Sequence, residues 1–325
     1  MRRSRDVGLL VSRAREGDPR AVARLISLVE DGDEVLPAVA AALAPYAGTA
    51  QVVGLTGSPG VGKSTTTNEL VRALRAAGHR VGVLAVDPSS PFTGGAILGD
   101  RVRMQEHTTD PGVYIRSMSS RGHLGGLAAT TPQAVRVLEG AGCDVVLVET
   151  VGVGQAEVEI ASLADTTLVL LAPGMGDAIQ AVKAGILEIA DVFVVNKADR
   201  AGADATYRDI QGMLSLGERV AGDWRPRVVR AVAVKGEGVD DIVAAMAAHR
   251  AWLVESGELR GRQVARASAE IEAIALATLR ARLGSVRDGA ALPGLAAEVA
   301  DGTLDPHTAA ANLLTTLTDL TDLST

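Results

Sequence analysis

The chain has 325 residues, of which 47% are hydrophobic and 22% charged, and its formal net charge is −7. This length and hydrophobic content are enough for one large globular domain with smaller additions. Aromatic residues make up only 2% and no basic run interleaves with them, so we expect no nucleic-acid partner. No apolar run approaches the roughly 20 residues that a membrane span needs. We therefore expect no membrane contact and a cytoplasmic location.

Residues 1–48 are expected to form a helical segment that serves packing rather than chemistry. Asp18-Pro19 predicts an N-cap followed by proline in the first helical turn. Val22, Leu25 and Val29 then follow at helical spacing, which gives the helix one apolar face. A second helix is expected at about 34–43.

Residues 49–250 alternate between short apolar runs and helical patterns. Such runs are typical of parallel strands that are covered on both faces. The pattern predicts a doubly wound, mostly parallel α/β domain with its ligand at the carboxyl ends of the strands. The expected strands are 51–55, 81–86, 113–116, 145–149, 167–171, 192–195 and 228–234.

A phosphate-binding pattern, G-x-x-x-x-G-K-[ST], follows the first expected strand. A helix expected at 65–77, ending at Gly78, would point its positive end and a run of N–H groups at a polyphosphate. Lys63 would reach the β- and γ-phosphates, and the Ser64 hydroxyl would bind Mg²⁺. The alternative is a glycine-rich turn without a ligand. The expected nucleotide-binding residues are Gly57, Ser58, Pro59, Gly60, Val61, Gly62, Lys63, Ser64 and Thr65.

The motif N-K-x-D, at Asn196, Lys197 and Asp199, follows another expected strand. A carboxylate at Asp199 would accept hydrogen bonds from guanine N1–H and the N2 amine, a donor pair that adenine lacks. The Lys197 stem would pack along the base, and Asn196 would tie this loop to the phosphate loop. The motif therefore favours guanine over adenine.

The expected strand 228–234 ends in Val232, Ala233 and Val234. In GTPases a Ser-Ala pair at this place offers backbone N–H groups to guanine O6. Val232 stands where serine would be, and a backbone contact survives such a change. The alternative for this segment is an ordinary buried strand.

Three acidic residues are candidates for holding Mg²⁺ or the attacking water. Glu149 ends a strand beside the phosphate loop. Asp87 and Asp100 bracket a Gly/Pro/Ser-rich loop, although a strand-end turn and a helix N-cap explain them equally well. Gln155 follows two glycines, but the sequence does not place it relative to a γ-phosphate.

Residues 251–325 are expected to be helical again, ending in a short helix within 301–325. An apolar stripe at spacings of three and four must be buried on its own domain or on another subunit. The stripe comprises Ile271, Ile274, Ala275, Thr278, Leu279 and Leu283.

Taken together, these residues resemble the MeaB/ArgK family of P-loop GTPases, which includes the human methylmalonic aciduria type A protein. The resemblance covers about 50–240. It rests on V-D-P-S-S-P-F-T-G-G-A-I-L-G-D-R at 86–101, S-R-G-H-L-G-G at 120–126, E-T-V-G-V-G-Q at 149–155, and the motif at 196–199.

The resemblance implies a GTPase that acts as a chaperone for an adenosylcobalamin-dependent acyl-CoA mutase. It implies Mg²⁺ held by Ser64, Asp87, Asp100 and Glu149, and these three acids with Lys63 as the catalytic residues. Residues 173–183 would form a switch that includes Lys183, whose alternative is a solvated helix charge. The C-terminal helices would form the arm of a homodimer.

Three rival functions stay open at this point. A nickel or cobalt metallochaperone needs clustered soft or imidazole ligands, whereas the chain has one cysteine, Cys143, and five scattered histidines. A kinase of amino-acid transport components would need an acceptor-binding feature, and none is visible. A nucleotide-gated scaffold would hydrolyse no GTP. The five histidines are His79, His107, His123, His249 and His307.

Overall fold

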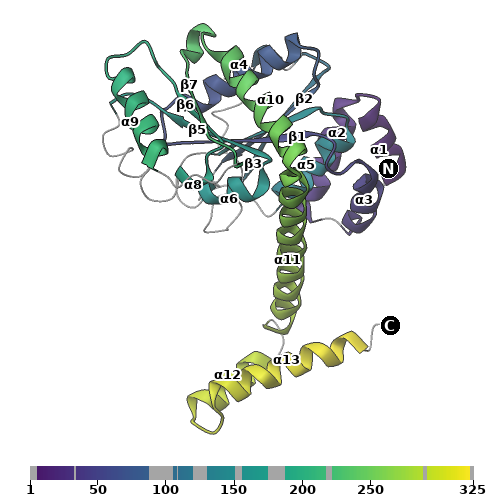
Figure 1. Cartoon of the computed structure of the whole chain (residues 1–325). Helices are drawn as coiled ribbons and strands as arrows, with labels where there is room; N and C mark the ends of the chain where they lie inside the picture. The colour runs from purple at the N-terminus through teal and green to yellow at the C-terminus, as the bar shows by residue number, and fades with distance from the viewer. Residues whose placement is uncertain are drawn as a thin grey trace. The chain divides into compact units, whose positions relative to one another are not determined.

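The computed structural model describes residues 6–32, 34–87, 105–107, 109–119, 130–150, 156–174, 187–216, 222–287 and 291–322. The chain forms two compact units, Met1–Arg266 and Ala267–Thr325. The first unit contains the sheet and the helices that cover it (Figure 1). It extends past residue 250, where the sequence places a boundary, because the start of the next helix is bound to the sheet.

All strands of the described sheet run parallel, in the order β3-β2-β4-β1-β5-β6-β7. This confirms the doubly wound α/β prediction. The chain leaves β1 toward β2 and β3 and later returns past β1 to β5, so the order reverses beside β1. Ligands bind at such a reversal. The strands are β1 (Gln51–Thr56), β2 (Val81–Asp87), β3 (Val113–Ser119), β4 (Val145–Thr150), β5 (Thr166–Leu171), β6 (Val192–Val195) and β7 (Arg227–Arg230).

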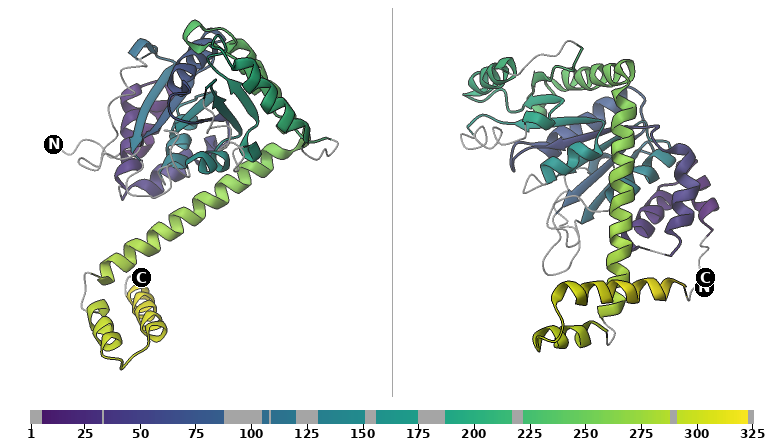
Figure 2. Two further views of the ribbon diagram at one scale, coloured as in Figure 1. Left: turned by 90° about the vertical axis from the view of Figure 1, so that its left-hand side faces the viewer. Right: turned by 60° about the horizontal axis from the view of Figure 1, so that its bottom comes forward.

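Helices cover both faces of this sheet (Figure 2). Successive strand residues enter different cores: Val52 packs with the N-terminal helices and α5 (Thr131–Gly140), whereas Val53 packs with α4 (Lys63–Ala76) and α10 (Val239–Ser256). The first face also carries α6 (Ala156–Leu163), and α9 (Ala203–Leu216) covers β6 and β7. Burial on both faces explains why the strand sequences are continuously apolar.

The N-terminal segment forms α1 (Val7–Arg15), α2 (Pro19–Asp31) and α3 (Leu36–Leu43). Asp18 caps α2 by accepting from the N–H groups of Arg20 and Ala21, as the sequence predicts. The third helix begins at Leu36 rather than at 34, with its proline in the first turn, where a missing N–H costs nothing. Short single-turn elements are η1 (Ala44–Tyr46), η2 (Gln105–His107), α8 (Leu187–Ile189) and η4 (Ala233–Lys235).

The last strand is shorter than the sequence predicts. It ends at Arg230, and residues 233–235 form the 3₁₀ turn η4, so the expected strand 228–234 is wrong at its carboxyl end. The N–H of Val232 donates to Glu237 O, 2.9 Å away, and the N–H of Lys235 donates to Val232 O at 2.8 Å. These bonds turn the chain back on itself directly after β7.

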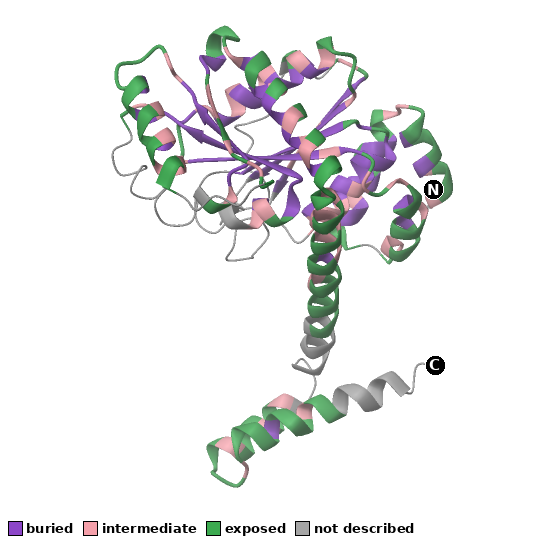
Figure 3. Cartoon of the chain, in the orientation of Figure 1, coloured by how far each residue is buried: buried purple, intermediate pink, exposed green. Residues whose placement is uncertain are grey.

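The second unit contains the end of α11 (Glu258–Arg287), α12 (Ala291–Ala300) and α13 (Pro306–Asp322). The final helix is longer than expected and begins at Pro306, where the Asp305 carboxylate accepts from two N–H groups. The apolar stripe of α11 is exposed in the single chain over its described residues up to Leu279: Ile271 is 68% and Leu279 51% accessible (Figure 3). None of the helices in the described ranges is both long and apolar enough for a bilayer.

Candidate nucleotide-binding site

The phosphate loop connects β1 to α4 and is packed tightly against two neighbouring loops. Gly57 has φ 137°, and a Cβ there would collide with the carbonyl of Leu170 at the end of β5. Gly62 has φ 101°, and a Cβ there would collide with the Asn196 amide. Only glycine allows both the backbone conformation and the close approach. The glycines of this motif therefore also hold the loop against the ends of β5 and β6.

Lys63 is the first residue of α4, two residues earlier than the expected helix start. Its side chain is buried, and its Nζ donates to Gly57 O at 2.7 Å and to Ser58 O at 3.3 Å. The ammonium is thus held inside the loop, next to the N–H groups of the first helical turn. A helix N-terminus with an added cation is a site for a polyphosphate.

Glu149 brings a buried carboxylate to the same place, since it pairs in register with Leu55 at the end of β1. Its Oε1 accepts from Ser64 Oγ at 2.6 Å, and its Oε2 accepts from Thr67 Oγ1 at 2.9 Å. Carboxylate and hydroxyl oxygens are hard ligands, the kind that Mg²⁺ prefers. Thr67 was missed by the sequence analysis. Its position four residues after Lys63, on the same helix face, is the signal that could have identified it.

Asp87 is the last residue of β2, so its backbone lies at the carboxyl edge of the sheet. That edge is the one from which the phosphate loop emerges. The Asp87 side chain lies outside the described residues, as do Asp100, Gln155 and Lys183. Their expected roles remain predictions.

Asn196 joins three loops of the site. Its Nδ2 donates to Val61 O of the phosphate loop at 2.8 Å, and its Oδ1 accepts from the N–H of Ala233 at 3.1 Å. Asn196 is buried, which strengthens both bonds. The predicted tie between the guanine motif and the phosphate loop is confirmed.

The other two residues of the motif face solvent at the rim of the site. Lys197 adopts φ 56°, and its Nζ donates to Gly60 O at 2.6 Å. Asp199 is partly exposed and pairs with Lys235, whose Nζ lies 3.5 Å from Asp199 Oδ2. Lys235 was not identified from the sequence, although lysine occurs only four times and all three others were singled out.

Comparison with known proteins decides the family. Residues 22–287 match the family described as "Methylmalonyl Co-A mutase-associated GTPase MeaB". The chain belongs to the MeaB family. The Escherichia coli protein named "GTPase ArgK" is 38% identical over 259 residues, which cover 77% of this chain and 78% of that protein. The MeaB-family chain is therefore a P-loop GTPase, as the motifs predicted.

Two further similarities are to a mouse protein and to a solved structure. The mouse protein named "Methylmalonic aciduria type A homolog, mitochondrial" is 42% identical over 214 residues, covering 65% of this chain and 52% of the mouse protein. A crystal structure entitled "LAO/AO transport system kinase" is 27% identical, with a TM-score of 0.71 over 98% of this chain and 99% of that one. The second similarity supports the same fold for this MeaB-family chain.

A different polar cluster lies at the opposite, amino edge of the sheet. Asp165 and Asp191 directly precede β5 and β6, and their side chains are 0% and 8% exposed. Arg262 of α11 donates two hydrogen bonds, of 2.8 and 2.9 Å, to the Asp191 carboxylate. Asp165 pairs with Arg250 and Arg266, each at 3.2 Å. The start of α11 is thereby bound to the sheet.

His249 lies inside this cluster, and its ring packs against both tryptophans, which also contact each other. Its ring centroid is 4.7 Å from that of Trp224 and 5.8 Å from that of Trp252. Its Nδ1 lies 3.0 Å from Thr166 Oγ1, while its Nε2 is 3.3 Å from Asp191 Oδ1 without the alignment of a hydrogen bond. Burial lowers the pKa of His249 to about 4, against the smaller attraction of Asp191. The ring is therefore neutral at pH 7.

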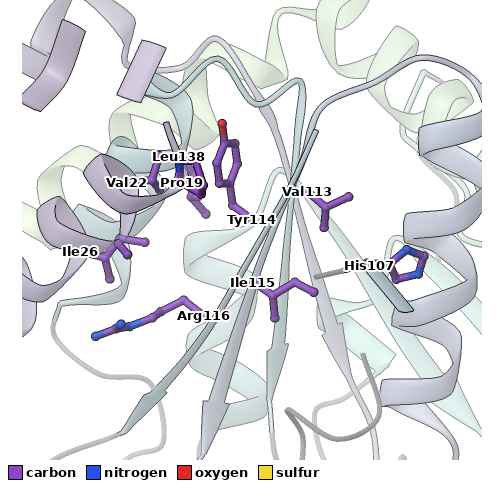
Figure 4. A pocket seen from close by; sticks show the side chains of 10 residues that line it. Pro19, Val22, Ile26, His107, Val113, Tyr114, Ile115, Arg116 and Leu138 are labelled. Carbon is purple, nitrogen blue, oxygen red and sulfur yellow. The ribbon is translucent and has the colours of Figure 1, made fainter. Parts of the chain in front are cut away.

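A cavity of about 240 Å³ lies along the edge strand β3 (Figure 4). Val22 and Ile26 of α2 line one side together with Tyr114, whereas Ile115 lies with His107 on the other. β2 and β4 separate this strand from β1 and its phosphate loop. The cavity thus belongs to the packing of α2 on the sheet edge.

The single cysteine, Cys143, is a buried free thiol, and burial raises its pKa to about 12.

Proposed function

We propose that this GTPase is a Mg²⁺-dependent chaperone of an adenosylcobalamin-dependent acyl-CoA mutase such as methylmalonyl-CoA mutase. Its GTP or GDP state would gate the loading or protection of the mutase cofactor. The family description names this mutase as the associated enzyme. The observation that carries the nucleotide-dependent part is the meeting of three loops around Asn196, one of which is the phosphate loop that leads to Ser64 and its bond to the buried Glu149. The cytoplasmic location expected from the sequence stays a prediction.

Phosphoryl transfer to water would rest on positioning and charge. Lys63 and the N–H groups of the phosphate loop would bind the β- and γ-phosphates. Ser64 and Glu149 would hold Mg²⁺, joined by Asp87 and Asp100. When bound, the ion would neutralise charge that develops on the phosphate oxygens.

Guanine would be read by the loop after β6 and by the turn after β7. Asp199 would accept from N1–H and the N2 amine, and the stem of Lys197 would pack along the base. The N–H of Val232 donates to Glu237 O and that of Ala233 donates to Asn196 Oδ1, so guanine O6 would meet Val234 instead. Val234 is 78% exposed, which leaves this side of the turn accessible to a base.

The partner interfaces would lie elsewhere on the chain. Residues 173–183, with Lys183, would relay the nucleotide state to the mutase. The exposed stripe of α11 would pair with a second copy to form a homodimer, because such a stripe must be buried. Sedimentation of the chain carrying Ile271→Glu and Leu279→Glu tests this: we expect a monomer, and an unchanged dimer would contradict the assignment.

GTP hydrolysis by a Lys63→Ala variant, with and without purified mutase, tests the function. We expect a loss of about 100-fold or more, the size seen when a transition-state donor is removed. Arg72→Ala on the exposed face of α4 is the matched control and should keep full activity. Unchanged hydrolysis in Lys63→Ala would overturn the site, and a mutase that changes neither hydrolysis nor cofactor loading would overturn the chaperone role.

A kinase is the second candidate, because the similar crystal structure carries that name. The phosphate loop could in principle deliver the γ-phosphate to a side chain instead of water. γ-Labelled GTP separates the two functions: label on protein supports the kinase, whereas label released as free phosphate supports hydrolysis.

A further inference from the structure

Lysine is rare in this chain, with four residues against 28 arginines. Lys183 lies outside the described part, and each of the other three places its Nζ on a loop of the nucleotide site. Lys63 contacts Gly57 O, Lys197 contacts Gly60 O, and Lys235 contacts Asp199. The first two belong to known motifs. The third calls for its own explanation.

Lys235 ends the turn η4, which the backbone holds firmly. Its N–H donates to Val232 O at 2.8 Å, and the N–H of the next residue donates to Ala233 O at 3.0 Å. Ala233 is in turn bound to the Asn196 side chain. The turn is thus fixed to the same residue that anchors the guanine motif, and from there the Lys235 ammonium reaches the Asp199 carboxylate.

We propose that Lys235 is a positioning residue that holds the Asp199 carboxylate in the orientation that reads guanine. The inference rests on the guanine-binding role proposed for Asp199. Guanine presents N1–H and the N2 amine side by side, so both carboxylate oxygens must lie in the plane of the base. Asp199 is 42% exposed, and an ion pair on one oxygen removes rotamers in which that plane is lost.

The choice of lysine over the far commoner arginine supports this role. The planar guanidinium fork binds both oxygens of a carboxylate at once. It would therefore compete with the two donors of guanine. An ammonium is a point charge that engages Oδ2 and leaves acceptor positions on both oxygens for the base.

The base selectivity of a Lys235→Met variant tests the proposal. Inosine diphosphate lacks the N2 amine of GDP, so the ratio of the two affinities measures how well Asp199 is oriented. We expect calorimetry to show that this ratio falls about two- to five-fold, the size of an exposed ion pair. If Lys235 only attracts the phosphates or supports the fold, both affinities will fall together, and an unchanged ratio would overturn the proposal.

Two further variants separate this inference from the guanine assignment itself. Arg200→Met removes the same charge next to Asp199 and should keep the wild-type ratio. Asp199→Asn should bring the ratio close to one, and adding Lys235→Met to it should change the ratio no further. GDP affinity unchanged in Asp199→Asn would defeat the guanine assignment. A normal Asp199→Asn result with a wild-type ratio in Lys235→Met would defeat only the positioning role.

Discussion

Strands β5 and β6 have polar residues at both their carboxyl and their amino ends, but different interactions hold the residues at the two ends. At the carboxyl ends, loops are joined by single hydrogen bonds between side chains and backbone, such as those of Asn196 and Lys197. At the amino ends, Asp165 and Asp191 are buried and paired with three arginines, and the Oδ2 atom of each also accepts from a backbone N–H.

This difference suits the carboxyl edge to nucleotide binding and the amino edge to support of the fold. A loop ammonium such as that of Lys197, which donates to a carbonyl, can exchange that partner for a nucleotide at little cost. A buried carboxylate that loses its arginine leaves an uncompensated charge, which is expensive. Nucleotide exchange is therefore expected to rearrange the carboxyl edge, while the amino edge keeps α11 attached to the sheet.

Breaking the amino edge should have the largest effect. Asp191→Asn removes the negative charge that is paired with Arg262. We expect the free energy of unfolding to fall by about 2–4 kcal/mol. This loss is smaller than for a fully buried pair because Arg262 is 32% exposed. Asp204→Asn is the control, since it breaks an exposed pair with Arg230 and should cost less than about 1 kcal/mol. Equal losses in urea denaturation would contradict the contrast between the two edges.

The pH dependence of the free energy of unfolding should include a contribution from His249, which lies at the amino edge. The pKa of His249 is lowered from 6.5 to about 4 in the folded chain, so the unfolded state binds more protons between these values. The free energy of unfolding should thus fall as pH drops from 6.5 to 4, with at most about 3 kcal/mol from this group. Thermal unfolding of a His249→Phe variant should lack this component. Identical pH slopes in the two proteins would refute the assignment.

The carboxyl edge should respond in function more than in stability. Thr67→Val removes the hydroxyl that holds Glu149, so the Mg²⁺ concentration for half-maximal GTP hydrolysis should rise about ten-fold. Thr66→Val is the control, because this neighbouring hydroxyl donates to Gly62 O and not to Glu149. A shift of the same size in both variants would mean that the effect comes from α4 rather than from the carboxylate.

The carboxyl edge was predictable because its motifs are local. Strands such as 192–195 are buried apolar runs whose ends coincide with polar residues, and the loops that follow them carry recognisable patterns. β7 was overextended because residues 231–234 stay apolar while their backbone already turns. Thr67 was missed because its partner lies 82 residues away.

The amino edge was not predictable at all. Asp165, Asp191 and Arg262 belong to no motif, and each is an ordinary charged residue in its own segment. Only the parallel strand order brings the two aspartates together beneath α10 and α11. Long-range ion pairs of this kind have no local sequence signal.

The most direct test of the central claim is calorimetry of GDP and ADP binding to the purified chain in Mg²⁺. Because Asp199 is expected to read a donor pair that adenine lacks, GDP should bind at least about 100-fold more tightly than ADP. Equal affinity for the two nucleotides, or no binding of GDP, would contradict the account.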